Sequence, residues 1–160
     1  MKKYKVSEML VARKDITRLA DGLRRRKLRV VFTNGVFDIL HRGHVQYLGK
    51  AKSFGDVLIV GLNSDQSVRR LKGPGRPVQS QRDRGEILLA LRAVDFVVVF
   101  GEDRPDHLIE QIRPDILVKG ADYKMAEIAG AEFVQSYGGK VRRVRLAPGR
   151  STSGIIKKMS

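Results

Sequence analysis

Residues 28–44 read LRVVFTNGVFDILHRGH, and this stretch predicts a strand, a turn and the start of a helix. Its first part, residues 28–33, is a largely apolar run without the regular polar alternation of a strand that has one face in water. Runs of this kind are typical of parallel sheets that are covered on both faces. Gly35 permits a tight turn directly after the strand, and we expect a helix over residues 45–54. The stretch therefore predicts one β-α unit of a covered parallel sheet.

Apolar runs of the same kind recur along the chain. They cover residues 57–62, 96–100, 116–118 and 141–146, the last of which is interrupted by arginines. In the segments between them, apolar residues recur at intervals of three and four, as in residues 87–94, which favours amphipathic helices. The alternation predicts an α/β fold, a Rossmann-like open parallel sheet with helices on both faces. In such sheets ligands bind at the carboxyl ends of the strands, where the strand order reverses.

The length of 160 residues and the mass of 18.0 kDa suit one compact domain. We expect residues 1–27 to form a helical extension, with a helix from about Ser7 to Arg25, and residues 28–160 to form the catalytic core. The segment KGPGRP, residues 72–77, contains too much glycine and proline for regular structure. Because it is short, we expect it to be a loop within the domain and not a linker between two domains.

The chain carries 32 lysine and arginine residues against 17 aspartate and glutamate residues, which gives a formal charge of +15. Such a surface attracts polyanions, among them nucleic acids, anionic lipids and phosphorylated metabolites. The basic clusters are scattered, and aromatic residues that could stack on bases make up only 6% of the chain. A nucleic-acid-binding module stays open as an alternative, but the charge by itself indicates only an anionic ligand.

The absence of cysteine excludes disulfide bonds, a thiolate nucleophile and zinc sites that use sulfur. The charged N-terminus does not lead into the apolar stretch of a secretory signal. The apolar runs have the length of strands, far short of the roughly 20 residues that cross a bilayer. We therefore expect a soluble, cytoplasmic protein without a membrane partner. The scattered basic clusters and the few aromatic residues favour small anionic ligands over a nucleic-acid partner.

Two of the three histidines, His41 and His44, lie where the helix after the first strand is expected to begin. The free N–H groups and the positive dipole end of a helix favour a bound phosphate. Gly43 lets the backbone approach a ligand, and the two histidines can project toward the same anion. Two other interpretations stay open: a histidine that only caps the helix, or a metal site, for which no third ligand has a recognisable spacing. We expect His107, the third histidine, to be an exposed surface residue.

The string GVFDILHRGH, residues 35–44, resembles the first signature of the nucleotidyltransferase superfamily, which includes cytidylyltransferases and adenylyltransferases. In that family the two histidines hold the nucleotide phosphates and stabilise charge on the transferred α-phosphate, a role that falls here on His41 and His44. The resemblance also implies that Phe37 and Asp38 line the nucleotide and substrate pocket.

A second candidate site is RSTSGII, residues 150–156, near the C-terminus. Hydroxyl groups and free N–H groups at a helix N-terminus accept a phosphate, although the same residues also serve as a simple helix cap. The segment resembles the second signature of the superfamily, which contacts the β- and γ-phosphates. Arg150 stands where many members have an uncharged residue.

The resemblance extends from residue 31 to residue 158 and indicates one subfamily, the D-glycero-β-D-manno-heptose 1-phosphate adenylyltransferases, which make the ADP-heptose precursor of the lipopolysaccharide inner core. The strings that carry it are GLNSD, RLKGPGRPV, VDFVVVFGED and LVKGADYKMAEIAG, beginning at residues 61, 70, 94 and 117. Many members are fused behind a sugar kinase, for which 160 residues leave no room, so we expect the stand-alone form.

This resemblance implies a set of roles. The catalytic residues would be His41, His44 and Lys72. The nucleotide would bind to Thr33, Asn34, Gly35, Phe37, Gly43, Arg84, Ser151, Thr152 and Ser153. The sugar phosphate would bind to Asp38, Asn63, Lys119, Asp122 and Tyr123. No side chain is implied as a metal ligand.

The implied reaction is attack by a heptose 1-phosphate oxygen on the α-phosphorus of ATP, with pyrophosphate leaving. A phosphate monoester is already largely ionised near neutral pH, so this nucleophile needs no strong general base. We expect Mg²⁺, bound mainly by the triphosphate, as the cofactor, and a homo-oligomer, most simply a dimer. The alternatives within the enzyme class are a glycerol-3-phosphate cytidylyltransferase and, with weaker support, a flavin-making adenylyltransferase.

Overall fold

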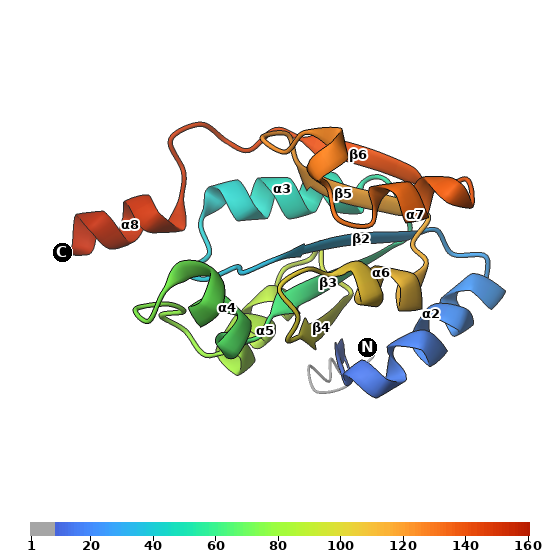
Figure 1. The fold of residues 1–160 in the computed structure, drawn as a ribbon, viewed down its shortest axis with the longest axis horizontal. Coiled ribbons are helices and arrows are strands. Elements are labelled where there is room, and N and C mark those ends of the chain that lie inside the picture. The colour runs from blue at the N-terminus through green and yellow to red at the C-terminus, as the bar shows by residue number, and fades with distance from the viewer. Residues whose placement is uncertain (1–8) are drawn as a thin grey trace.

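Short strands, most of them apolar, lie side by side in a single parallel sheet (Figure 1). The computed structural model describes residues 9–160, and its strands are β1 (Leu10–Val11), β2 (Val30–Gly35), β3 (Val57–Asn63), β4 (Phe96–Phe100), β5 (Ile116–Gly120) and β6 (Lys140–Val144). Their order is β1-β4-β3-β2-β5-β6. The chain builds the sheet from β2 through β3 to β4 and then returns to the other side of β2 with β5. The predicted open parallel sheet is therefore confirmed, and its strand order reverses between β2 and β5.

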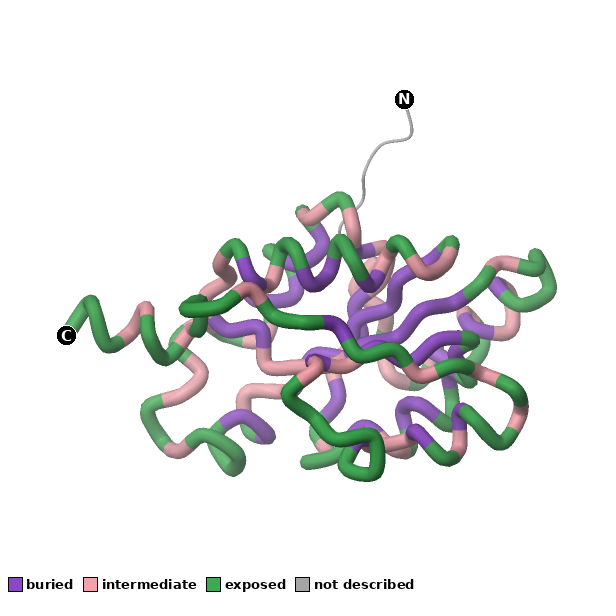
Figure 2. Tube along the Cα trace, turned by 90° about the horizontal axis from the view of Figure 1, so that it is seen from above, coloured by how far each residue is buried: buried purple, intermediate pink, exposed green. Residues whose placement is uncertain are grey.

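Helices cover both faces of this sheet, as predicted. They are α2 (Ile16–Arg25), α3 (Arg42–Lys52), α4 (Asp65–Lys72), α5 (Gln81–Leu89), α6 (Asp106–Ile112), α7 (Ala131–Ser136) and α8 (Thr152–Met159), with short 3-10 helices η1 (Arg13–Asp15) and η2 (Met125–Glu127). Buried residues of α2, α6 and α7 form one core cluster with Phe32, and those of α3 and α5 form a second cluster with Val31. Neighbouring β2 residues thus face opposite cores, and buried positions run through the middle of the molecule (Figure 2). Helix α8 contains no buried residue and projects from the body (Figure 1).

The N-terminal segment differs from the predicted helix over residues 7–25. Residues 7 and 8 lie outside the described part of the chain. Leu10 and Val11 form a short edge strand that pairs with Val97 and Val98 of β4, and the α-helix begins only at Ile16. The two residues extend the sheet because the edge of β4 offers unpaired backbone groups. Their apolar side chains pack against the two cores.

Two helices begin earlier than their apolar spacing indicated. Helix α3 starts at Arg42 and not at Val45, because His41 caps it, and this brings Gly43 and His44 into the first turn. Helix α5 spans Gln81–Leu89 and not residues 87–94, because the Ser80 side chain accepts a hydrogen bond from the backbone N–H of Asp83. A polar cap therefore decides the start of each helix.

Candidate active site

A cavity of about 700 Å³ lies at the carboxyl ends of β2 and β5, beside the point where the strand order reverses. The β2–α3 loop, the loop between α4 and α5, the end of β5 and the start of α8 all contribute to its walls. This volume falls in the range of small-molecule sites, and the position is the one that open parallel sheets favour for ligands. The cavity is therefore the candidate active site.

The two histidines meet at the N-terminus of α3. The His41 Nδ1 accepts a hydrogen bond from the Gly43 N–H at 3.1 Å, and the His44 Nδ1 accepts one from the His41 N–H at 3.3 Å. Their ring centroids are 3.9 Å apart, and the Phe37 ring contacts His44 edge-on at 5.5 Å. Because each Nδ1 is an acceptor, the proton of a neutral imidazole lies on Nε2. Each histidine thus keeps one N–H donor for a ligand.

Both histidines are held in the neutral form. Burial, and to a smaller extent the neighbouring His41, lowers the pKa of His44 to about 4. Burial and the nearby Arg150 guanidinium also lower the pKa of His41 from its ordinary value. Near neutral pH the pair therefore offers two neighbouring hydrogen-bond donors and adds no positive charge.

The backbone of the β2–α3 loop is shaped around these side chains. Phe37 and Ile39 adopt φ angles of 46° and 40°, in the left-handed region that non-glycine residues rarely occupy. Gly43 lies against His41, since a Cβ at this position would be 2.8 Å from the His41 Cε1 and 2.9 Å from its Nδ1. Such local strain is typical of functional loops, and here it brings Asp38 inward while the histidines line the cavity.

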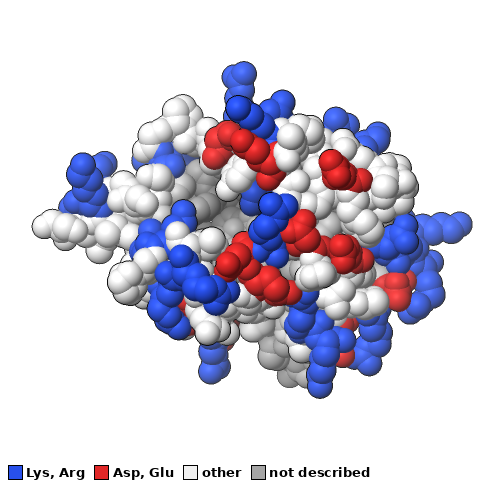
Figure 3. Space-filling model, viewed as in Figure 1, with Lys and Arg blue, Asp and Glu red and all other residues white. Residues whose placement is uncertain are grey.

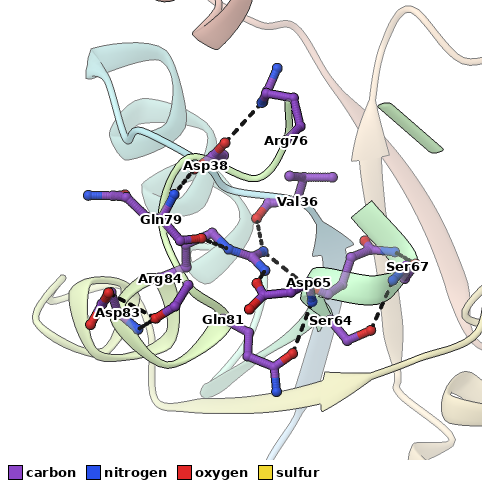
Figure 4. A network of polar contacts seen from close by, with 12 residues as sticks. Val36, Asp38, Ser64, Asp65, Ser67, Arg76, Gln79, Gln81, Asp83 and Arg84 are labelled. Carbon is purple, nitrogen blue, oxygen red and sulfur yellow. Dashed lines mark hydrogen bonds and ion pairs between the residues drawn. The ribbon is translucent and has the colours of Figure 1, made fainter. Parts of the chain in front are cut away.

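Asp38 joins three walls of the cavity, and Figure 4 shows its contacts with the loop after α4. Its buried carboxylate accepts hydrogen bonds from the Val78 N–H at 2.8 Å, the Gln79 N–H at 3.0 Å and the Arg76 Nε–H at 2.9 Å. Its backbone carbonyl accepts a hydrogen bond from the Thr152 hydroxyl at 2.8 Å, at the start of α8. Burial alone would raise the pKa of Asp38, but the two backbone N–H groups and Arg76 lower the pKa below its ordinary value. The carboxylate is thus an internal anion that holds the loop after α4.

Arg84 of α5 is a second internal junction (Figure 4). Its side chain is fully buried. The guanidinium donates to the Val36, Asn63 and Gln79 carbonyls at 2.6, 2.9 and 3.0 Å, and to the Asp65 carboxylate at 2.7 Å. Arg84 therefore joins the ends of β2 and β3 to the loop after α4.

The far side of the cavity carries Lys119 and the residues after β5. The Lys119 ammonium lies 3.4 Å from both the backbone and side-chain oxygens of Asn34, and 4.9 Å from the centre of the Tyr123 ring. Burial lowers the pKa of Lys119, and the Asp122 carboxylate opposes this effect. The buried Thr33 hydroxyl bonds the Tyr47 hydroxyl at 2.8 Å, behind this wall. Lysine and a nearby carboxylate could together recognise a polar, anionic ligand.

The start of α8 closes the cavity from the remaining side. The Ser151 side chain caps the helix by accepting a hydrogen bond from the Gly154 N–H at 3.0 Å. Ser153 and Arg150 line the cavity and are exposed. Lys72, at the end of α4, is also exposed and lines it. Two helix N-termini, those of α3 and α8, thus face one cavity with basic side chains near both.

The family follows from a comparison with known sequences. A sequence model described as cytidylyltransferase-like matches residues 32–155 of the chain. The chain belongs to the cytidylyltransferase-like family. The matched residues begin in β2 and end in α8, so both candidate phosphate loops lie inside the matched region.

Curated relatives of this cytidylyltransferase-like chain include two bacterial proteins named bifunctional protein HldE. The protein of Syntrophotalea carbinolica is 57% identical over 136 residues, which are 85% of this chain and 28% of that protein. The protein of Wolinella succinogenes is 53% identical over 152 residues, which are 95% of this chain and 31% of that protein. The chain therefore spans less than a third of the length of these relatives.

Solved structures show the same fold. A lipopolysaccharide core biosynthesis protein from Thermoplasma volcanium matches with a TM-score of 0.60 and 32% identity, over 75% of this chain and 97% of that one. A pantoate-β-alanine ligase from Francisella tularensis, solved with an ATP analogue and β-alanine, matches with a TM-score of 0.62 at 19% identity, over 94% of this chain and 74% of that one. The second match supports the fold alone.

The structure brings most of the predicted site residues of this cytidylyltransferase-like chain to one cavity. Those that line it are Asn34, Gly35, Phe37, Asp38, His41, Gly43, His44, Asn63, Lys72, Lys119, Asp122, Tyr123, Ser151, Thr152 and Ser153. Asn63 is buried and donates its side-chain N–H to the Ser67 hydroxyl at 3.0 Å. His107 is exposed and paired with Glu110, as expected of a surface residue.

Two residues that were predicted to bind the nucleotide do not line the cavity. Thr33 and Arg84 are buried behind the cavity, with their polar groups bonded to protein atoms, so neither residue lines the cavity in this structure. Arg76 and Tyr47 line the cavity and were not predicted. Tyr47 lies three residues after His44 and so on the same helix face, a spacing that could have indicated it. The sequence shows Arg76 only as a basic residue in a loop, which is too weak a signal to predict that it lines the cavity.

Among residues 9–160 no three histidine, cysteine, aspartate or glutamate side chains gather where they could hold a metal ion. In the same part of the chain, no helix has the length and apolar character to span a membrane.

Proposed function

We propose that this chain is a nucleotidyltransferase that transfers AMP from ATP to D-glycero-β-D-manno-heptose 1-phosphate. The products are ADP-D-glycero-β-D-manno-heptose and pyrophosphate, which would place the reaction in the synthesis of the lipopolysaccharide inner core. We infer that the protein works in the cytoplasm, where ATP is available, and that it forms a homodimer.

One observation carries this proposal: the two imidazoles at the start of α3 are neutral donors that line the same cavity as the start of α8. With each Nδ1 bonded to a backbone N–H, the two Nε2–H groups can donate to oxygens of one phosphate. Helix N-termini on two sides favour the rest of a polyphosphate chain. A nucleoside triphosphate fits such a site better than a substrate with a single anionic group.

The reaction then needs positioning and charge stabilisation more than acid–base chemistry. A phosphate monoester oxygen attacks the α-phosphorus of ATP, a new P–O bond forms and the bond to the β-phosphate bridging oxygen breaks. His41 and His44 donate hydrogen bonds to the α-phosphate oxygens as negative charge develops there. Lys72 balances charge on the departing pyrophosphate, and the α3 and α8 N-termini align the two reactants.

ATP would enter as its magnesium complex. Mg²⁺ keeps several waters and is commonly held by substrate phosphates with few protein ligands. The Asp38 carboxylate, already bonded to three protein donors, is not free to coordinate it. We expect the ion to be bound mainly by the triphosphate.

The sugar phosphate would occupy the opposite side of the cavity, where Lys119 is the basic group and the exposed Asp122 and Tyr123 offer polar contacts. The similarity to the bifunctional HldE proteins and to a lipopolysaccharide core biosynthesis protein supports a heptose as this sugar. Since the chain spans less than a third of the HldE proteins, the choice of sugar remains part of the proposal.

The test is pyrophosphate release in the presence of magnesium, with ATP or CTP offered against D-glycero-β-D-manno-heptose 1-phosphate or glycerol 3-phosphate. We expect turnover only with ATP and the heptose phosphate. Turnover with CTP and glycerol 3-phosphate would contradict both proposed substrates but would agree with the assigned active site. If no pair of substrates released pyrophosphate, the proposal would be rejected, and binding of another polyanion to the basic surface would be the next hypothesis.

The histidine role is tested in the same assay with His44→Asn. Asparagine keeps an acceptor near the Nδ1 position for the His41 N–H but has no group at the position of the Nε2–H donor. We expect kcat to fall by about 10²-fold, the usual cost of one charge-stabilising donor. His107→Asn, on the exposed third histidine, is the matched control and should leave kcat unchanged.

A further inference from the structure

The loop after α4 carries an arginine that the proposed mechanism does not use. Arg76 lines the cavity, and its side chain is 16% exposed. Its Nε–H is bonded to the Asp38 carboxylate at 2.9 Å. Within residues 9–160 no hydrogen bond is present at its Nη1 or Nη2. Because a guanidinium carries five N–H donors in a fixed fork, four remain for a ligand.

The partner of Arg76 is held more firmly than a surface carboxylate. The Asp38 side chain is fully buried, and two backbone N–H groups of the same loop, those of Val78 and Gln79, also donate to it. Arg76 is therefore fixed at its Nε edge by Asp38 (Figure 4), and the same residue lines the cavity with its Nη groups free of protein partners among residues 9–160. A pre-oriented guanidinium loses less side-chain freedom on binding than a mobile one.

Asp38 also places this arginine beside the start of α8. Its carbonyl accepts the Thr152 hydroxyl, so the loop of Arg76 and the first turn of α8 are attached to the same residue. Lys72 and Arg150 line the cavity as well. Basic groups that converge on one cavity beside a helix N-terminus favour an extended polyanion with several phosphate groups.

We propose that Arg76 binds the polyphosphate chain of the nucleotide and that Asp38 is the positioning residue that orients it. The planar fork lets Arg76 serve both anions at once: Nε–H to the buried carboxylate, and the Nη groups to phosphate oxygens. This inference deepens the proposed function and rests on it for the identity of the ligand. It replaces Arg84 with Arg76 as the arginine that faces the phosphates.

The experiment is a calorimetric titration of the full chain with inorganic triphosphate at fixed ionic strength. We expect Arg76→Met to weaken binding by about 10- to 100-fold, as for the loss of a charge-assisted contact. The matched control is Arg82→Met, because Arg82 is an exposed arginine that pairs with Glu86 and does not line the cavity. Equal affinities for wild type and Arg76→Met, or equal losses in both variants, would overturn the proposal.

The positioning role of Asp38 is tested by a double-mutant cycle. Asp38→Asn should weaken triphosphate binding in the wild-type background and have little further effect when Arg76 is already methionine. Additive losses would show that the two residues act separately and would reject the positioning role. If the Asp38→Asn variant does not fold, the Arg76→Lys variant tests the same positioning role. Lysine has one nitrogen for two anions, so full recovery of affinity would contradict the bridging geometry.

This titration is independent of the sugar. Should the turnover assay find another substrate pair, or none, the proposed function fails while the triphosphate affinities still decide the role of Arg76. Wild-type protein that binds no triphosphate would overturn the Arg76 inference whatever the turnover assay finds.

Discussion

At the scale of single residues, burial determines the protonation of His44. Its pKa of about 4 lies below the ordinary value of 6.5 because the imidazolium would be desolvated. Between these two pH values the unfolded chain binds more protons at this histidine than the folded chain does. The stability that depends on neutral His44 is therefore complete above pH 6.5 and is lost as the pH falls toward 4.

We expect His44→Asn to reduce this pH dependence. In urea unfolding at pH 7 and pH 4.5, wild type should lose more free energy of unfolding between the two pH values than the variant does. His107→Asn, which changes an exposed histidine, should lose as much as wild type. Identical losses in wild type and His44→Asn would mean that burial does not hold this histidine neutral.

The position of His41 depends on the missing side chain of Gly43. A Cβ there would lie 2.8 Å from the His41 ring, so Gly43→Ala forces the imidazole to move. A displacement of about 1 Å in a catalytic group can cost about 10²-fold in rate. We expect kcat for the proposed nucleotidyl transfer to fall by that order, with a circular dichroism spectrum like that of wild type.

The matched control for this prediction is in the same helix. Gly49 is exposed, and a Cβ there would meet nothing within 4 Å. Gly49→Ala should therefore keep full activity and stabilise the fold by about 0.5–1 kcal/mol, the usual gain in a helix interior. Normal turnover in Gly43→Ala would show that the histidine tolerates displacement.

The site residues that could be predicted from the sequence belong to short local motifs. The two histidines and Gly43 lie within four residues of one another, so their meeting at a helix start follows from helix geometry. The environments of Arg84 and Arg76 could not be predicted in this way. Both are basic residues near a loop, and long-range contacts with Asp65 and Asp38 decide that one is buried and the other lines the cavity.

At the scale of elements, the end of α2 contains a residue in an unfavourable conformation. Lys27 has a φ of 56°, in the left-handed region. Its N–H bonds the Arg24 carbonyl at 2.8 Å, and the Leu28 N–H bonds the Leu23 carbonyl at 3.2 Å. These two bonds form the helix-ending motif in which glycine is the preferred residue.

We expect Lys27→Gly to stabilise the protein by about 1 kcal/mol, because glycine avoids the steric cost of the left-handed region. For a chain of this size the gain corresponds to about 2–4 °C in Tm, measurable by calorimetry. Lys27→Ala is the control, since alanine keeps a Cβ and should bring no such gain. Equal Tm values for the glycine and alanine variants would refute this explanation.

The order of the elements was predictable because apolar runs and helical spacing are local signals. The residues at which the helices and strands begin and end could be predicted less well. The caps formed by His41 and Ser80 move two helix starts away from the apolar pattern, because a side-chain bond to the backbone competes with apolar periodicity. The edge strand β1 depends on β4, a partner far along the chain, and two residues have too little pattern to indicate it.

At the scale of the whole molecule, the reversal of strand order explains why distant motifs meet. β2 and β5 are neighbours, so the loop after residue 35 and the residues after 120 open on the same edge of the sheet. A parallel sheet with this order could be expected from the β-α alternation. The approach of α8 to the β2–α3 loop could not, because it depends on long-range contacts such as the hydrogen bonds from the Thr152 hydroxyl to the Asp38 and Ile39 carbonyls.

The net charge of +15 acts over a longer range than any of these contacts. Basic side chains are spread over the visible face of the molecule among fewer acidic ones (Figure 3). Such a field would attract the anionic substrates of the proposed reaction before they reach the cavity. Its reach is about 30 Å at 0.01 M salt and about 8 Å at 0.15 M salt. Charges far from the cavity should therefore influence substrate capture only when the salt concentration is low.

Arg25 and Arg26 allow this effect to be separated from direct contacts. They are exposed and precede β2, whose six residues span about 17 Å between them and the cavity end of the sheet. In the proposed reaction, Arg25→Gln/Arg26→Gln should lower kcat/KM for ATP at 10 mM salt, while at 200 mM salt it should match wild type. The value of kcat should be equal in both proteins at either concentration, since neither arginine lines the cavity. A loss of kcat/KM that persists at 200 mM salt would mean that these arginines act through the fold and not through the field, because screening would have removed any electrostatic effect across that distance.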